Sequence, residues 1–421
     1  MVNNLLEKKK INVLSEVGEL EGVILHTPGP EVENMTPKNA ERALYSDILN
    51  LSVASSEYAQ FAGAMKKITN VYEVSDLLAV VLENEKAKDK LVRKICRNEH
   101  TQELLDYLFH LSSKQLAKEL IEGVPLRKNT LTKYLSKERY ILRPLHNFFF
   151  MRDASMAIRN KVLIGKMANK VREREALIME AIFNCERLFD TTTVNPNEVD
   201  NPEKITIEGG DVLVAREDIL LIGLSARTSS HGIDFIIQYL KQFGEKRHIL
   251  VQELPHSPES FIHLDMVFTL LDTDKCMIYE PVILDPNKFK TIHIEIDNGK
   301  VSFIKEKNNL LEALSALGMD LKPIYCGGVS DRWTQEREQW HSGANFFAVG
   351  PGKLFGYDRN LNTIEELNKN GFEIISAQDV INGKTNPNDF NKYIVTIKGS
   401  ELARGGGGCR CMTMPISRKP I

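Results

Sequence analysis

Short apolar runs recur in pairs along the chain from about residue 150 onward. Residues 154–158 and 162–165 have the pattern of a β-hairpin and precede a charged amphipathic segment, 169–188, with helical spacing. The same order returns three times, each time followed by a further strand. These units are 212–214, 219–223, a helix near 230–243 and 248–254; then 266–271, 276–279, a helix near 308–317 and 323–326; then 346–349, 354–356, a helix near 363–369 and 372–376. Recurring units of one type predict an α/β architecture with internal rotational symmetry.

The two ends of the chain supply the parts of a fifth unit. Residues 20–28 are typical of a short strand ended by Pro28-Gly29-Pro30, a helical stretch follows at 54–69, and the tail 411–416 is apolar and strand-like. A disordered tail would be polar, so this pattern favours an ordered one. The symmetry brings strand ends together around a central axis, where polar residues could meet.

Residues 64–122 differ from the rest because they contain no Gly and no Pro. Leu104, Leu108 and Leu111 are spaced as on one helix face, and Ser112 with Gln115 forms a candidate capping box. We therefore predict an inserted helical bundle at 73–140, with 1–72 and 141–421 forming one ββαβ catalytic domain. A set of helices that binds a partner is the alternative interpretation.

Composition excludes several classes of protein. The chain has 421 residues, of which 42% are hydrophobic and 26% charged, with a net charge of −3. These values are typical of a soluble globular enzyme and predict no nucleic-acid or membrane partner. The N-terminal stretch 1–13 has no apolar core of signal-peptide length, and no later stretch could span a bilayer. The six scattered cysteines are expected to be reduced thiols in a cytoplasmic protein. They are Cys96, Cys185, Cys276, Cys326, Cys409 and Cys411.

Each unit begins with a polar cluster. A single cluster of this kind is usually a salt bridge or a turn cap, but clusters at equivalent places in successive units indicate one shared site. The clusters are Asn147 with Arg152-Asp153, Ile207-Glu208-Gly209-Gly210-Asp211, Ile262-His263-Leu264-Asp265-Met266, Arg337-Glu-Gln-Trp340-His341-Ser-Gly343-Ala-Asn345, and the tail from Arg404 to Pro415.

The tail offers a nucleophile. Four glycines allow a ligand to approach the backbone, and Cys411 lies near Arg404 and Arg410, which predicts a lowered thiol pKa. A flexible linker with incidental cysteines is the alternative. Two cysteines separated by one residue, without further ligands at zinc spacing, do not indicate a metal site.

The other clusters offer an acid–base group and carboxylates. His263 can act as general acid and base, while Asp153, Glu208 and Asp265 could hold a cation such as a planar guanidinium. Signatures of serine hydrolases, zinc peptidases and nucleotide-binding loops are absent from the sequence, so we expect neither a metal nor an organic cofactor.

Together these motifs resemble those of arginine deiminase. The similarity includes Phe150-Met-Arg152-Asp153, the Glu208-Gly-Gly-Asp211 and His263-Leu-Asp265 elements, Arg337 to Asn345, and Cys411-Met-Thr-Met-Pro415, together with Ser15-Glu-Val-Gly18 and Asp47-Ile-Leu-Asn50. Several of these elements are shared with the wider superfamily of guanidino-group-modifying enzymes, and the helical insert points to arginine deiminase within it. The resemblance implies a five-bladed ββαβ propeller, hydrolysis of free L-arginine to citrulline and ammonia, and a homodimer or homotetramer.

The resemblance also implies roles for individual residues. Cys411 would attack the guanidinium carbon and form a covalent thiouronium intermediate, and His263 would then activate water. Asp153 and Asp265 would hold the guanidinium nitrogens, and Glu208 would pair with His263. Three residues match positions that bind the substrate α-carboxylate; for the two arginines, surface ion pairs are the alternative. These three are Asn147, Arg172 and Arg227.

The chain departs from the family pattern at a few positions. Gly406 stands where many members have an arginine that contacts the substrate carboxylate, and Arg404 or Arg410 could compensate. Met151 replaces a small hydroxyl residue, and His341 is expected to be structural. Cys409 is expected to pack rather than react. The alternatives to arginine hydrolysis are a hydrolase of agmatine or a methylated arginine, and a weakly active arginine-binding protein.

Overall fold

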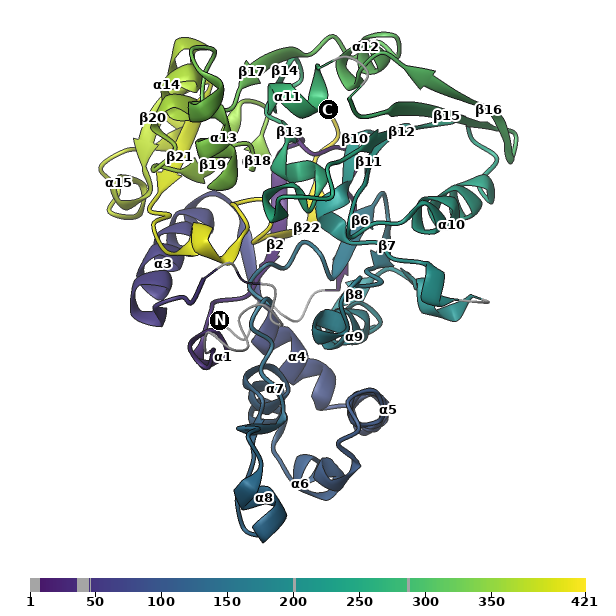
Figure 1. Cartoon of the computed structure of the whole chain (residues 1–421), viewed down its shortest axis with the longest axis vertical. Coiled ribbons are helices and arrows are strands. Elements are labelled where there is room, and N and C mark those ends of the chain that lie inside the picture. Colours follow the sequence, from purple (N-terminus) through teal and green to yellow (C-terminus); the bar gives the residue numbers. More distant parts are fainter. Residues whose placement is uncertain (1–7, 36–44, 46, 200–201, 286–287) are drawn as a thin grey trace.

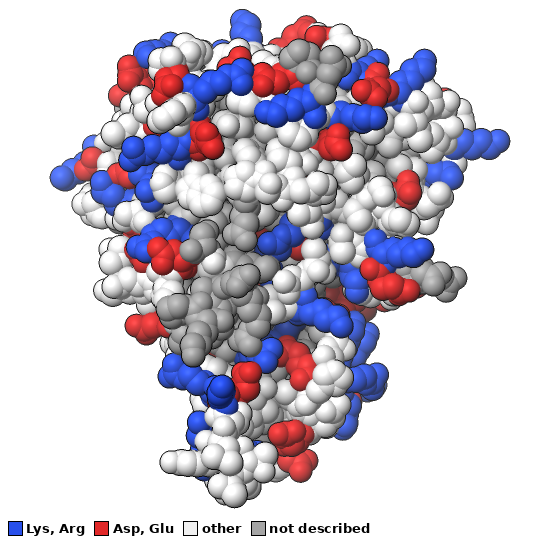
Figure 2. Space-filling view, viewed as in Figure 1, with Lys and Arg blue, Asp and Glu red and all other residues white. Residues whose placement is uncertain are grey.

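The computed structural model describes residues 8–35, 45, 47–199, 202–285 and 288–421. Residues 1–7 lie outside this range; they belong to the N-terminal stretch in which we expect no signal peptide. Within it, no helix is both long and apolar enough to cross a membrane. Figure 2 shows Lys and Arg side chains interspersed with Asp and Glu over the face in view, as expected for a small net charge.

Five sheets of the described chain share one arrangement, in which an antiparallel strand pair lies beside a parallel third strand (Figure 1). This arrangement confirms the repeated units expected from the sequence. In chain order the first three sheets contain β6 (Ser155–Ile158), β7 (Lys161–Ile164) and β9 (Thr193–Val194); β10 (Val212–Arg216), β11 (Ile219–Leu224) and β12 (Arg247–Glu253); and β13 (Phe268–Leu270), β14 (Lys275–Ile278) and β17 (Lys322–Tyr325). The other two contain β18 (Phe347–Gly350), β19 (Lys353–Tyr357) and β21 (Tyr393–Ile397); and β22 (Met414–Arg418), β2 (Leu20–Leu25) and β3 (Asn70–Glu73).

Helices connect the parallel strands, because a parallel pair cannot be joined by a tight turn. Asparagine or serine side chains cap several of these helices: Asn50 accepts from the N–H of Val53, and Ser229 from that of Gly232. The connecting helices are α9 (Glu173–Phe183), α10 (Ser230–Lys241), α12 (Leu310–Ser315), α14 (Leu361–Lys369) and α3 (Leu51–Ile68).

The fifth unit is assembled from both ends of the chain, as the sequence predicts. β22 pairs antiparallel with β2, and β2 pairs parallel with β3 after the crossover through α3. Arg418 is buried and donates to the main-chain oxygens of Gly18 and Ala348, both at 2.7 Å. The tail strand that follows Cys411 is therefore fixed within the fold.

Two parts of the sheets differ from the sequence expectation. Residues 372–376 were expected to close the fourth unit, but β21 lies between β19 and β20 (Glu373–Ser376). β21 is almost wholly buried, whereas β20 is largely exposed, as suits an edge strand. The hairpin of β15 (Thr291–Asp297) and β16 (Lys300–Lys307) was not expected, and it extends the β10–β12 sheet.

Residues 74–135 form a set of helices below the sheets (Figure 1). The predicted capping box is present: the N–H of Gln115 donates to Ser112 Oγ, and the N–H of Ser112 to Gln115 Oε1, both at 3.4 Å. α4 and α5 contact α9, so one apolar core runs from these helices to the β6–β7 hairpin. The helices are α4 (Val74–Leu82), α5 (Glu85–Asn98), α6 (Leu105–Phe109), α7 (Ser113–Glu122) and α8 (Leu131–Leu135).

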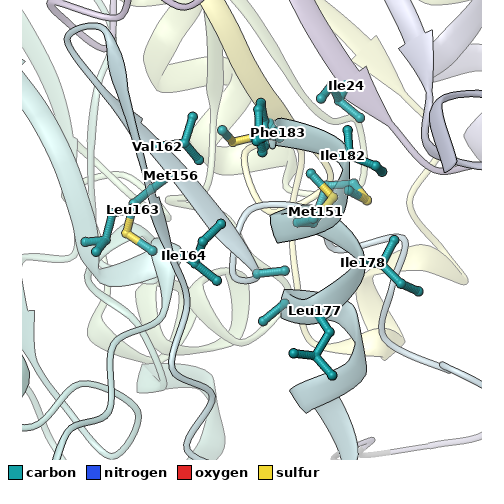
Figure 3. Close-up of a cluster of buried hydrophobic side chains, with 14 of the residues drawn as sticks. Ile24, Met151, Met156, Val162, Leu163, Ile164, Leu177, Ile178, Ile182 and Phe183 are labelled. Atoms are coloured by element: carbon teal, nitrogen blue, oxygen red, sulfur yellow. The ribbon is translucent and has the colours of Figure 1, made fainter. Parts of the chain in front are cut away.

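This core explains why an apolar residue, Met151, stands where the family motif has a small hydroxyl residue. Figure 3 shows Met151 beside Ile178 and Ile182 of α9, within the cluster of buried apolar side chains. Met151 is fully buried there. Its place in the family motif is thus a packing position, although its neighbours in sequence, Arg152 and Asp153, face polar groups.

The remaining short elements are β1 (Lys9–Lys10), α1 (Pro30–Glu33), β4 (Val124–Pro125), β5 (Tyr140–Leu142), β8 (Phe189–Asp190), α11 (Glu280–Ile283), α13 (Arg332–Trp340) and α15 (Ala377–Ile381). They include two separate two-stranded sheets, β1 with β8 and β4 with β5, and short helices in connections.

Candidate active site

The polar clusters occupy equivalent positions in the fold. Each one lies in the turn that precedes the first strand of an antiparallel pair. In chain order these residues are Asp153 before β6, Glu208 before β10, His263 before β13, Asn345 before β18 and Cys411 before β22. The internal repetition therefore brings together residues that are up to 258 positions apart, as the interpretation of one shared site requires.

A cavity of about 510 Å³ opens where these turns meet. Six of the eight site residues predicted from the sequence line it. Glu208 and Asp265 do not line the cavity but contact residues that do. The six lining residues are Asn147, Asp153, Arg172, Arg227, His263 and Cys411.

Asn345 fixes the position of the Cys411 thiol. Its Nδ2 donates to Cys411 Sγ at 3.2 Å and to the main-chain oxygen of Asp265 at 3.1 Å. Its Oδ1 accepts from the backbone N–H groups of Arg410 and Cys411, at 2.9 and 3.3 Å. A β-carbon at Gly408 would lie 2.6 Å from that Oδ1, so glycine is required for this close approach. The sequence placed Asn345 in a polar cluster but did not predict this role.

The protonation of Cys411 differs from the sequence expectation. Burial raises the pKa of the thiol well above its ordinary value, and the nearby carboxylates of Asp265 and Asp153 raise it further. Arg410 does little to offset this, because its guanidinium pairs with Glu16 at 2.9 Å and with Asp265 at 2.8 Å. The prediction of a lowered pKa was wrong because burial and the carboxylates of Asp265 and Asp153 outweigh the charge of Arg410, which is itself paired with carboxylates.

His263 lies between two carboxylates. Its Nε2 is 3.0 Å from Glu208 Oε2, and its Nδ1 is 3.6 Å from Asp153 Oδ1. Burial lowers the pKa of His263, but the charges of Asp153 and Glu208 outweigh burial and raise it to about 9. Burial raises the pKa of Glu208, but the hydrogen bond to His263 and the charge of Arg227 outweigh burial and lower the pKa to about 2. At neutral pH the pair is therefore an imidazolium and a carboxylate.

Gly210 permits this arrangement. A β-carbon there would lie 2.4 Å from His263 Nδ1, so any side chain would displace the imidazole. The N–H of Gly210 also donates to Asp153 Oδ1 at 3.2 Å. Gly210 in the second cluster thus allows the imidazole to pack closely against the backbone.

Asp265 is buried against the thiol. Its Oδ2 accepts from Arg410 and lies 3.7 Å from Cys411 Sγ. Its Oδ1 has no hydrogen-bond partner among the described residues. A buried carboxylate oxygen without a donor is costly, so this atom is suited to accept an N–H from a bound ligand.

The residues predicted to bind a carboxylate all reach the cavity, with different surroundings. Arg172 is buried rather than on the surface, and it pairs with Asp153 at 2.6 Å and Glu175 at 2.8 Å. Arg227 lies 3.8 Å from Glu208. Asn147 is buried, and its main-chain oxygen accepts from Arg172 at 3.4 Å. Arg172 does form ion pairs, but because it is buried these are not the surface ion pairs of the alternative interpretation.

The tail residues around the departure from the family pattern differ in whether they face the cavity. Gly406 lines the cavity with φ of +86°, and a β-carbon there would meet nothing within 4 Å. Arg410 cannot compensate because it is buried in its ion pairs, whereas Arg404 lines the cavity and pairs with Asp47 and Glu401. Cys409 is fully buried in an apolar core and does not line the cavity, so it packs, as predicted.

Three of these groups could in principle hold a metal ion. Asp153, Glu208 and His263 offer ligand atoms within 4.8 Å of one another. In this structure the same atoms bond to one another, to Arg172 and to the N–H of Gly210. A compact set of carboxylates beside a thiol and an imidazolium is equally suited to an organic cation with several N–H groups.

Known proteins resemble this chain over nearly its whole length. The family model described as arginine deiminase matches residues 41–418. An arginine deiminase of Bacillus cereus is 34% identical over 434 residues, which cover 98% of this chain and 100% of the relative. One from Mycoplasma capricolum is 32% identical over 425 residues, covering 98% of each chain.

Solved structures show the same fold at low identity. An amidinotransferase from Microseira wollei has a TM-score of 0.54 at 13% identity and covers 98% of both chains. The N-terminal domain of a cyanobacterial arginine dihydrolase, bound to product, has a TM-score of 0.53 at 13% identity and covers 94% of this chain and 97% of that one. By its sequence and its family match, this chain belongs to the arginine deiminase family.

Proposed function

We propose that this chain hydrolyses the guanidinium group of free L-arginine to L-citrulline and ammonia. The observation that carries the proposal is a single cavity where the Cys411 thiol lies beside carboxylates and the His263 imidazolium. Membership of the arginine deiminase family supports the same reaction. The chain's own side chains supply the chemistry, so we expect no metal or organic cofactor.

Binding would begin with the guanidinium. Asp265 Oδ1, buried and without a donor, would accept one N–H, and Asp153 would accept others at the cavity wall. Asn147, Arg172 and Arg227 would meet the α-carboxylate. Because the cavity wall is rich in arginine, the proposal favours L-arginine over agmatine, which has no carboxylate.

A bound guanidinium would also activate the nucleophile. The carboxylates of Asp265 and Asp153 raise the thiol pKa, and a cation placed among them would offset this effect. The thiol would lose its proton to solvent, because His263 is already protonated, and the thiolate would then attack the guanidinium carbon. The imidazolium of His263 would protonate one nitrogen, the C–N bond would break and ammonia would leave, with Sγ still bonded to the carbon.

Water would complete the reaction. The imidazole left after ammonia departs would take a proton from water as the oxygen attacks the thiouronium carbon. Collapse of the adduct would break the C–S bond and release citrulline as the hydroxyl proton of the adduct passes to Sγ, which restores the thiol beside the imidazolium. Glu208 would hold the imidazole in position and stabilise its charged form through the 3.0 Å contact.

The proposal extends to the architecture. We propose that the five sheets form the blades of a ββαβ propeller around the site, with 1–72 and 141–421 as its catalytic domain. Residues 73–140 would be an inserted helical bundle that packs on α9. We also propose a cytoplasmic enzyme that assembles as a homodimer or homotetramer.

Mass spectrometry of the enzyme quenched during turnover tests the function. L-Arginine should leave an amidino adduct on the peptide that contains Cys411, and citrulline and ammonia should accumulate in equal amounts. Cys411→Ala should show neither product nor adduct. Turnover of agmatine without turnover of L-arginine would overturn the proposal, and binding of arginine without citrulline at any pH would favour a binding protein.

A further inference from the structure

Arg359 is a cavity residue to which neither the sequence motifs nor the proposed mechanism assigns a role. It follows β19 and lines the cavity together with Cys411 and His263. Its Nη1 donates to the main-chain oxygens of Gly399 at 3.0 Å and Ser400 at 3.3 Å. Its Nη2 lies 3.2 Å from His341 Nε2, which must accept because a guanidinium can only donate.

All these partners of Arg359 are neutral. Burial lowers the pKa of His341, and the charges of Arg359 and Arg337 lower it further, so the imidazole is uncharged at neutral pH. Asp358, the preceding residue, pairs with Lys398 instead. Among the described residues, no carboxylate forms an ion pair with Arg359, so its charge is uncompensated.

The other arginines of the cavity wall already have carboxylate partners. Arg172 contacts Asp153 and Glu175, Arg227 lies near Glu208, and Arg404 pairs with Asp47 and Glu401. A new anion must compete with these carboxylates for the three arginines. At Arg359 it would meet no such competition.

Arg359 is also held in place before any ligand arrives. Its acceptors, Gly399 and Ser400, begin a segment whose N–H groups are bound by the buried Glu57 of α3. Glu57 accepts from Ser400 at 2.9 Å, from Glu401 at 3.0 Å and from Leu402 at 2.9 Å. Among the described residues, the Nε–H and one Nη2–H of Arg359 have no acceptor. A fork of two parallel N–H donors matches a carboxylate.

We propose that Arg359 determines specificity by binding the α-carboxylate of the substrate. This inference rests on the proposed function, since it assumes that the ligand of the cavity is an amino acid with a guanidinium at its far end. Gly406, which lines the same cavity, presents open space and no charge, so this carboxylate-binding charge comes from the turn after β19 rather than from the glycine-rich loop.

Steady-state kinetics of Arg359→Gln test the proposal, with agmatine as an inhibitor that shares the guanidinium and lacks the carboxylate. The KM for L-arginine should rise about 10- to 100-fold, the range expected for losing hydrogen bonds to a charged group. The inhibition constant of agmatine should differ by less than about 2-fold between Arg359→Gln and the wild-type enzyme. Arg332→Gln is the matched control, because Arg332 is exposed on α13 and pairs with Asp285 outside the cavity.

Equal changes for arginine and agmatine would overturn the proposal and leave Arg359 as a residue that only positions the loop. No change for either ligand would overturn it as well. If Arg359→Gln does not fold, Arg359→Lys decides: it keeps the charge but loses the fork, so the arginine KM must rise while agmatine inhibition stays constant. A wild-type enzyme that makes no citrulline would refute the proposed function itself, whatever the variants show.

Discussion

Asn345 Nδ2 lies 3.2 Å from Cys411 Sγ, while the Oδ1 of the same amide accepts the N–H of Cys411. One side chain thus fixes both the thiol and the backbone that carries it. Asn345 precedes β18 and Cys411 precedes β22, so this contact links two of the repeated units across the site. The position of the nucleophile depends on a neighbouring sheet as much as on its own.

Replacing Asn345 by Ala should lower kcat about 100-fold, because small displacements of a reacting group carry penalties of that size. The KM for arginine should change little, since the carboxylates that grip the guanidinium remain. Steady-state citrulline formation measures both constants. Asn382→Ala, on the turn after α15, is the control and should behave as wild type. A normal kcat in Asn345→Ala would show that the thiol needs no such support.

The two cysteines of the tail should respond differently to substitution. Cys411→Ala should abolish citrulline formation, because it removes the only tail thiol that lines the cavity within the described chain. Cys409→Ala should keep most of the activity, with a lower free energy of unfolding because Cys409 packs in an apolar core. Activity assays and urea denaturation separate the two effects. Loss of activity in well-folded Cys409→Ala would contradict the assignment of the nucleophile.

Local pattern predicted the elements, but contacts between distant residues decided their arrangement. The β6–β7 hairpin was found because both strands and the turn lie within ten residues. β21 was missed as the partner of β19 because 35 residues separate the two strands, and the apolar residues of β20 lie nearer in the sequence. The site could be predicted from the polar clusters at the beginning of each repeated unit, because the repeats bring equivalent turns together.

The charge state of the site could not be predicted in the same way. Arg410 directly precedes Cys411, so the sequence suggested that it would lower the thiol pKa. The fold instead buries the thiol beside Asp265 and Asp153, and Arg410 is paired with Glu16 from the other end of the chain. Arg359 was missed for the complementary reason, because only the fold shows that its partners are neutral. Ion pairing depends on tertiary contacts, which a single sequence does not display.

The pH profile should show the titration of His263. Its pKa is raised to about 9, so the imidazolium needed to protonate the leaving nitrogen is present below that pH and lost above it. The value of kcat/KM should therefore fall as pH rises through about 9. Glu208→Gln removes one of the charges that raise this pKa and should shift the fall to lower pH. A profile that stays flat to pH 10 would show that another group donates the proton.

Gly406→Arg should lower the KM for L-arginine while reducing stability. The side chain would enter the open space at this point of the cavity wall and add a charge near the carboxylate end. Gly406 has φ of +86°, where a residue with a β-carbon costs about 1 kcal/mol or more, so the thermal midpoint should fall. Gly406→Gln is the matched control, since it carries the same strain without the charge. It should show the same drop in thermal midpoint and no gain in affinity. If both variants leave the KM unchanged, the carboxylate end of the substrate lies out of reach of residue 406, and Arg359, Arg172 and Arg227 must bind it without help from the loop.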